Sequence, residues 1–189
     1  WVEPKKPNDF NVINPCNEDP CAIISLGSKE DTNAAIKSAK NAFETWKETT
    51  KEDRLNYLEK LLSVYKKRSR EMAEAISLEM GAPMDWATEV QTASGQLHLE
   101  DFILRLKDFE FDEHFNKKSN NHICYEPIGV CGLITPWNWP INQIALKVIP
   151  ALATGCTMIL KPSEIAPISG MLFAEMIDEV GFPKGVFNL

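Results

Sequence analysis

Two short polar segments in the second half of the chain could carry chemistry. Thr-Pro-Trp-Asn-Trp-Pro at 135–140 follows an apolar run over 130–135, and Lys-Pro-Ser-Glu at 161–164 follows another over 157–160. If both runs are parallel strands, the two segments meet at the carboxyl edge of one sheet, where open α/β sheets bind ligands. Each segment also precedes a predicted helix, whose N-terminal dipole favours an anion. The pattern predicts a nucleotide or substrate site, although the chain has no Gly-x-Gly-x-x-Gly fingerprint and no Walker loop.

These candidate residues also have purely structural interpretations. Asn138 could cap the helix that follows it, and the tryptophans on either side could belong to the core. Lys161 and Glu164 could form an exposed ion pair in a loop. Lys147 could extend its aliphatic stem along the edge of an apolar helix. Taken alone, the spacing leaves these alternatives open.

The elements that must position the two segments alternate along the chain after residue 129. Tight turns separate the predicted elements, which are strand 130–135, helix 141–154, strand 157–160, helix 169–180 and a strand opening at 186. Such alternation predicts a parallel sheet with right-handed crossovers.

The first part of the chain is rich in charge and has helical periodicity. Apolar residues recur every three or four positions in four segments, which predict helices over 29–47, from 51, over 70–80 and over 84–108. We expect Trp46 and Trp86 to lie in the core. Short strands are predicted over 10–13 and 22–26, and 109–112 is expected to pair with 122–126.

Composition excludes several classes of protein. The 189 residues carry a net charge of −7, so there is no basic field for nucleic acid or an anionic membrane. Residues 127–146 lack charge, but their prolines and glycines argue against a membrane-spanning helix. The five cysteines contain no Cys-x-x-Cys pair and there are only three histidines, which argues against a metal site and a disulfide framework. We therefore expect buried, reduced thiols in a cytoplasmic protein, and assign the histidines no role.

Two long runs make the chain recognisable. They are Glu-Pro-Ile-Gly-Val-Cys-Gly-Leu-Ile-Thr-Pro-Trp-Asn-Trp-Pro at 126–140 and Lys-Val-Ile-Pro-Ala-Leu-Ala-Thr-Gly-Cys-Thr-Met-Ile-Leu-Lys-Pro-Ser-Glu at 147–164. Residues 11–15, 77–81 and 181–189 agree with them. Together these segments closely resemble the NAD(P)-dependent aldehyde dehydrogenase superfamily.

The resemblance implies an α/β fold. An N-terminal helical layer over 29–108 would precede the β-α-β start of a parallel, Rossmann-like NAD-binding sheet over 129–189. Residues 1–28 and 109–128 would form a small β arm for oligomerisation, so the full-length enzyme is expected to be a homo-oligomer.

The resemblance also implies roles for individual residues. Asn138 looks like the family's oxyanion-hole asparagine, and Lys147 matches a lysine assigned a charge-relay role in some members. The NAD site, which could also accept NADP, would be lined by Ile134, Thr135, Pro136, Trp137, Asn138, Lys161, Ser163 and Glu164. The aldehyde tunnel would be lined by Trp139, Asn142, Gln143 and Leu146. Two of these four are amides, which favours a polar aldehyde.

The family's nucleophilic cysteine and general-base glutamate are expected beyond residue 189, because no cysteine of this chain matches the catalytic motif. The chain is therefore expected to be an N-terminal portion that is inactive alone. The parent reaction would form a thiohemiacetal, transfer a hydride and hydrolyse a thioester. The alternatives are an acylating enzyme that uses coenzyme A and a non-catalytic dinucleotide-binding or assembly module.

Overall fold

A three-stranded parallel sheet forms the centre of the computed structural model, which describes residues 1–116 and 120–189. Its order is β5-β6-β7, and the strands are β5 (Val130–Ile134), β6 (Thr157–Lys161) and β7 (Phe187–Asn188). The crossover helices are α6 (Pro140–Ala153) and α7 (Ile168–Val180). The predicted α/β architecture with a parallel sheet is confirmed.

The helical layer begins with three helices, two of which start at a capping box and one of which ends at a left-handed glycine. Ser28 with Asp31 forms a capping box at the start of α1, and Thr50 with Asp53 forms one at the start of α2. Gly81, with a φ of 75°, ends α3 in the left-handed conformation that glycine adopts readily. The three helices are α1 (Lys29–Trp46), α2 (Lys51–Lys67) and α3 (Ser69–Met80).

The fourth predicted helix is three consecutive segments. These are α4 (Met84–Trp86), a π-helical stretch (Ala87–Thr92) and α5 (Ala93–Asp108). A widened turn of this kind is rare and occurs frequently at functional sites. The apolar periodicity predicted the length of the helical region and gave no sign of the π-helical stretch.

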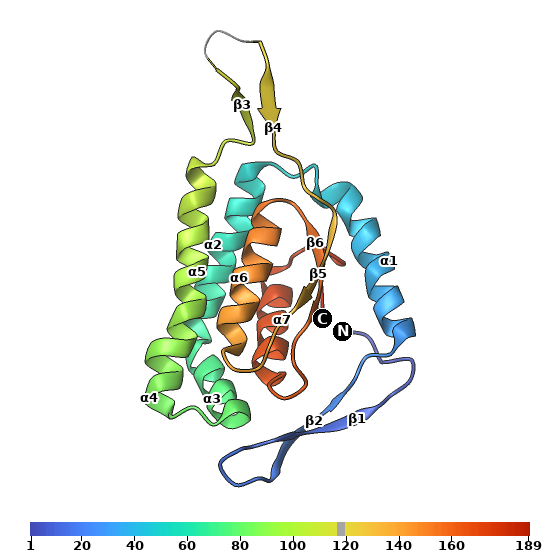
Figure 1. Ribbon diagram of the computed structural model, residues 1–189, viewed down its shortest axis with the longest axis vertical. Coiled ribbons are helices and arrows are strands. Elements are labelled where there is room, and N and C mark those ends of the chain that lie inside the picture. Colours follow the sequence, from blue (N-terminus) through green and yellow to red (C-terminus); the bar gives the residue numbers. More distant parts are fainter. Residues whose placement is uncertain (117–119) are drawn as a thin grey trace.

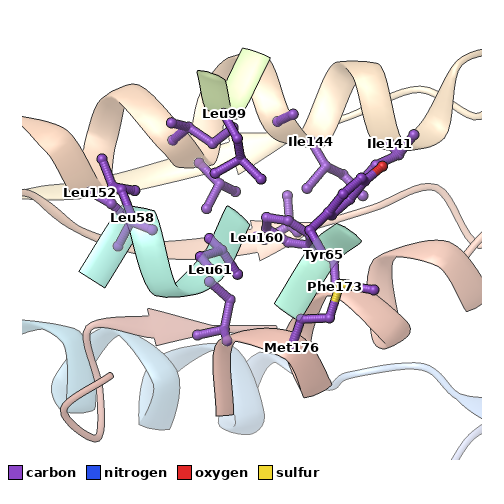
Figure 2. Packing of buried hydrophobic residues seen from close by; sticks show 14 of the residues in the cluster. Leu58, Leu61, Tyr65, Leu99, Ile141, Ile144, Leu152, Leu160, Phe173 and Met176 are labelled. Atoms are coloured by element: carbon purple, nitrogen blue, oxygen red, sulfur yellow. The ribbon is translucent and has the colours of Figure 1, made fainter. Parts of the chain in front are cut away.

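The helices cover the sheet unequally (Figure 1). Helix α1 packs along the strands on one side, and α6 and α7 lie on the other with α2 and α5 outside them. The buried side chains between these helices form one core (Figure 2), which includes Leu58, Leu61, Tyr65, Leu99, Ile141, Ile144, Leu152, Leu160, Phe173 and Met176. This core fixes α6 and α7 against the sheet.

Two hairpins lie outside the sheet, and Figure 1 places them at opposite ends of the molecule. One pairs β1 (Asp9–Ile13) with β2 (Pro20–Ser25), and the other pairs β3 (Asp112–His114) with β4 (His122–Cys124). Segments 1–28 and 109–128 therefore form two separate two-stranded sheets. Residues 117–119 of the second segment lie outside the described residues.

The register of the second hairpin differs from the prediction. The ladder runs over 112–114, not 109–112, although the backbone N–H of Tyr125 also donates to the carbonyl of Phe111 at 2.8 Å. Phe109 lies before the ladder, and its ring contacts those of Phe111 and Tyr125 at centroid distances of 4.8 and 5.3 Å.

Some burial predictions are confirmed and others are wrong. Trp46 is buried, but Trp86 is 49% exposed because it lies at the edge of the molecule with its ring against Trp139. All five cysteines are free, yet Cys16 and Cys124 are exposed because both lie on the hairpins.

Gly95 sets how closely α5 approaches α2 and α6. A Cβ there would overlap the Tyr65 hydroxyl and would lie 2.9 Å from Cγ1 of Ile141, the second residue of α6. We expect Gly95→Ala to lower the free energy of unfolding by about 1–3 kcal/mol, because overpacking a rigid core forces side chains to shift. Denaturant unfolding measures this. Gly27→Ala is the control, since no atom of the described residues lies within 4 Å of a Cβ at Gly27. Equal stability of the two variants would contradict the prediction.

Candidate functional site

The sheet register brings the two polar segments together. Ile134 is paired with Lys161 at the carboxyl ends of β5 and β6. Just beyond the ladder, the backbone N–H of Thr135 donates to the carbonyl of Lys161 at 3.2 Å. The prediction that segments 135–140 and 161–164 lie at the same edge of a parallel sheet is confirmed.

The first segment presents both apolar surface and unpaired polar groups. Ile134 is 72% exposed and Trp137 is 47% exposed. The Thr135 hydroxyl is buried and has no hydrogen-bond partner in the described residues. Buried polar groups are normally satisfied, so this hydroxyl is an exception among the described residues.

Asn138 does not cap α6. The N-cap residue of α6 is Trp139, which makes no side-chain cap hydrogen bond, and Pro140 begins the helix. The Asn138 side chain is exposed, and it makes no hydrogen bond within residues 1–116 and 120–189. The capping interpretation is therefore wrong, and the amide is available to an external group.

The second segment carries an ion pair at the edge of the sheet. Nζ of Lys161 lies 3.1 Å from Oε2 of Glu164 and 3.2 Å from the carbonyl oxygen of Pro162. The Ser163 hydroxyl accepts the backbone N–H of Ile165 at 3.3 Å. The Glu164 backbone N–H and the Lys161 ammonium lower the pKa of the Glu164 carboxyl. Glu164 is consequently an anion at neutral pH, and the loop presents one charge of each sign.

Two amides of α6 are held by their oxygen atoms. Oδ1 of Asn142 lies 2.8 Å from Nε2 of His98 on α5, and Oε1 of Gln143 accepts from Nζ of Lys147 at 3.3 Å. In the His98 tautomer with a proton on Nε2, both amide oxygens accept and both amide NH₂ groups keep their donors. The sequence assigned no role to His98, because its partner is 44 residues away and no local pattern links the two.

The remaining tunnel candidates lie at the start and along the exposed side of α6. The ring of Trp139 meets that of Trp86 edge to face, with centroids 6.4 Å apart, and Leu146 is 41% exposed. Trp86 precedes the π-helical stretch directly, so this stretch lies beside the segment that carries Asn138.

Glu79 is a second residue that the sequence analysis missed. It is 1% exposed at the end of α3, and its carboxylate accepts the backbone N–H groups of Ile168 and Ser169 at the start of α7. Burial raises the pKa of Glu79 to about 7, although these hydrogen bonds oppose the rise. Its sequence context, an acidic residue near a helix end, resembles many solvated positions.

No helix in the described part of the chain is both long and apolar enough to cross a membrane. Among the same residues, no group of three or more His, Cys, Asp or Glu side chains could hold a metal ion.

The whole chain matches known proteins. A sequence model of the "Aldehyde dehydrogenase family" matches residues 1–189. The chain is 48% identical over 190 residues to 3-succinoylsemialdehyde-pyridine dehydrogenase of a Pseudomonas species, covering 100% of this chain and 39% of that protein.

Solved structures are similarly close. The crystal structure of an aldehyde dehydrogenase from Bartonella henselae has a TM-score of 0.98 at 55% identity, with 100% of this chain and 40% of that chain covered. An aldehyde dehydrogenase C mutant from Pseudomonas syringae, solved with NAD+ and octanal, has a TM-score of 0.96 at 41% identity, with 100% and 38% covered. The chain thus spans about two-fifths of the length of these relatives.

Proposed function

The chain belongs to the aldehyde dehydrogenase family, and from this premise we propose that its full-length protein oxidises an aldehyde to a carboxylic acid with NAD. The observation that carries the proposal is the pairing of Ile134 with Lys161, which joins the two polar segments at one sheet edge. Relatives solved with NAD+, one of them also with octanal, support the same chemistry.

The residues at this edge fit an adenine dinucleotide. Lys161 and Glu164 offer a donor and an acceptor for ribose hydroxyls, with Ser163 between them. The exposed side chain of Ile134 suits packing against a ring of the coenzyme. Segment 134–138 would lie along the nicotinamide side, with Pro136 and Trp137 as its wall. When bound, NAD supplies the acceptor for a hydride.

Asn138 would stabilise negative charge on the aldehyde oxygen. Addition of a nucleophile to a carbonyl converts its oxygen into an alkoxide, and a fixed N–H donor aimed at that atom lowers the barrier. The exposed amide of Asn138, which has no hydrogen-bond partner among residues 1–116 and 120–189, meets this need. Because the donor acts on charge that develops in the transition state, its effect falls mainly on kcat.

The substrate would carry a hydrogen-bond acceptor besides its aldehyde. His98 and Lys147 occupy the amide oxygens of Asn142 and Gln143, which leaves the NH₂ groups to donate. Lys147 would act through Gln143 by fixing its orientation. Trp139 and Leu146 would supply the apolar part of the tunnel.

The full-length protein would be a cytoplasmic homo-oligomer. Five free cysteines suit a reducing compartment. The segment around β3 and β4 carries exposed apolar side chains, with Phe115 64% and Ile128 88% exposed. Exposed apolar groups on a projecting hairpin suit contact with another subunit.

The test is coenzyme reduction by the full-length protein with a panel of aldehydes and either NAD or NADP. We expect aldehyde-dependent formation of reduced coenzyme, with the carboxylic acid identified as product. Residues 1–189 alone are the matched control and are expected to give no turnover, since no cysteine in them matches the family's catalytic motif. Binding of NAD without turnover by the full-length protein would contradict the proposal and favour a non-catalytic module, and a requirement for coenzyme A would favour an acylating enzyme.

A further inference from the structure

Glu79 caps a helix to which it does not belong. Its carboxylate accepts two N–H groups in the first turn of α7, from Ile168 and, at 3.0 Å, from Ser169. The first N–H groups of a helix have no partner within it, and the N-cap residue Pro167 provides no side-chain cap. A residue 89 positions earlier in the chain therefore satisfies the start of α7.

The helix that carries Glu79 is itself firmly anchored at this end. Gly81 donates its N–H to the carbonyl of Ser77 at 2.9 Å, and the Ser77 hydroxyl donates to the carbonyl of Ala82 at 2.8 Å. A Cβ at Gly81 would lie 2.7 Å from Cγ of Pro15, so the β1–β2 connection packs directly on this turn. The end of α3 is thus a fixed point from which the carboxylate reaches α7.

The first turn of α7 touches the loop that carries Lys161 and Glu164. A Cβ at Gly170 would lie 3.3 Å from Cγ of Pro162 and 3.3 Å from Cδ1 of Ile144. Pro162 joins Lys161 to Ser163, and Lys161 donates to its carbonyl. The first turn of α7 therefore packs on Pro162, which lies between Lys161 and Glu164 in the chain, so a shift of this turn toward the loop would displace Pro162.

We propose that Glu79 is a positioning residue for coenzyme binding, which holds the start of α7 and thereby fixes Lys161 and Glu164 in the geometry that receives the ribose. This inference rests on the proposed function, because it requires segment 161–164 to bind NAD. The buried carboxylate has no ion pair with Lys or Arg in the part of the chain that the structure describes. Burying such a group is unfavourable unless its hydrogen bonds compensate, and here those bonds all lead to α7.

The experiment compares Glu79→Ala and Glu79→Gln in the full-length protein with Glu74→Gln as the matched control. Glu74 lies on the same helix but is exposed and pairs with Arg70. Calorimetry measures the Kd for NAD without aldehyde, and steady-state kinetics give kcat at saturating NAD and the KM for aldehyde. We expect Glu79→Ala to weaken NAD binding about tenfold and Glu79→Gln about threefold, since the amide oxygen still accepts an N–H. The Kd of Glu74→Gln for NAD should stay within about twofold of the wild-type value. The kcat and the aldehyde KM of both Glu79 variants should also stay within about twofold of wild type.

Each outcome decides between a positioning role and a merely structural one. If both Glu79 variants bind NAD as wild type does, or if kcat falls as far as the affinity, the inference is overturned. If Glu79→Ala does not fold, Glu79→Gln alone decides. A wild-type protein that binds NAD but oxidises no aldehyde contradicts the proposed function, while the calorimetric comparison still tests Glu79. Absence of NAD binding in the wild type overturns both.

Discussion

Replacement of Asn138 by alanine in the full-length protein is expected to lower kcat by about 10²–10³-fold, which is the usual effect of removing one oxyanion donor. The affinity for NAD should change little, because the amide acts on charge that exists only in the transition state. Steady-state kinetics with saturating NAD measure kcat, and calorimetry measures the affinity for NAD.

Thermal unfolding separates this role from a structural one. A helix cap replaced by alanine costs about 1 kcal/mol of stability, but Asn138 caps nothing, since the N-cap residue of α6 is Trp139. The melting temperature of Asn138→Ala should therefore match that of wild type. Asn33→Ala, at an exposed position of α1, controls for loss of a surface amide. A variant with reduced stability and full activity would remove Asn138 from the catalytic machinery.

Local sequence patterns predicted the parts of this fold that local energetics determine. The helices predicted over 29–47, from 51 and over 70–80 have ends that depend on residues within one helical turn, which are the capping boxes at Ser28 and Thr50 and the left-handed glycine at Gly81. The alternation of apolar runs and tight turns after residue 129 predicted the parallel sheet, and the sheet placed Lys161 next to Ile134. A topological rule was enough to predict that the two polar segments lie together at one edge of the sheet.

Features that depend on distant partners were missed. His98 meets Asn142 only because α5 packs on α6, and Glu79 reaches α7 across 89 residues. Trp86 was assigned to the core from its residue type, but the three-dimensional path of the chain places it at the edge. The family resemblance assigned roles to the motif residues, but it gave no information on the side chains that hold those residues in place.

Coenzyme choice is expected to depend on Glu164. The Glu164 backbone N–H and Lys161 lower the pKa of this carboxyl, so it is charged at neutral pH. In the proposed geometry it accepts a hydrogen bond from the 2′-hydroxyl of NAD, whereas NADP would place a phosphate of about −2 charge beside it. Like charges about 4 Å apart repel by up to about 4 kcal/mol per charge pair at an effective dielectric of about 20.

Two features of the site reduce that repulsion. Lys161 lies 3.1 Å from the carboxylate, and both side chains are exposed to screening solvent, 64% for Lys161 and 44% for Glu164. We therefore expect kcat/KM to favour NAD over NADP by about tenfold to hundredfold, which corresponds to about 1.4–2.8 kcal/mol. Glu164→Gln should lower the NAD-to-NADP ratio of kcat/KM at least about threefold. The change should come mainly from a higher kcat/KM with NADP, because the amide keeps an acceptor but loses the charge.

Steady-state kinetics with both coenzymes, at low and high ionic strength, test this account. Glu44→Gln is the matched control, because Glu44 forms a comparable exposed ion pair with Lys47 at 3.0 Å on α1. Salt should lower the wild-type NAD-to-NADP ratio of kcat/KM by screening the repulsion from Glu164. In Glu164→Gln only the attraction between Lys161 and the phosphate remains, so salt should not lower that ratio. Equal or better use of NADP by the wild type would mean that attraction between Lys161 and the phosphate outweighs repulsion from Glu164. In that case Lys161→Gln, rather than Glu164→Gln, would restore the preference for NAD.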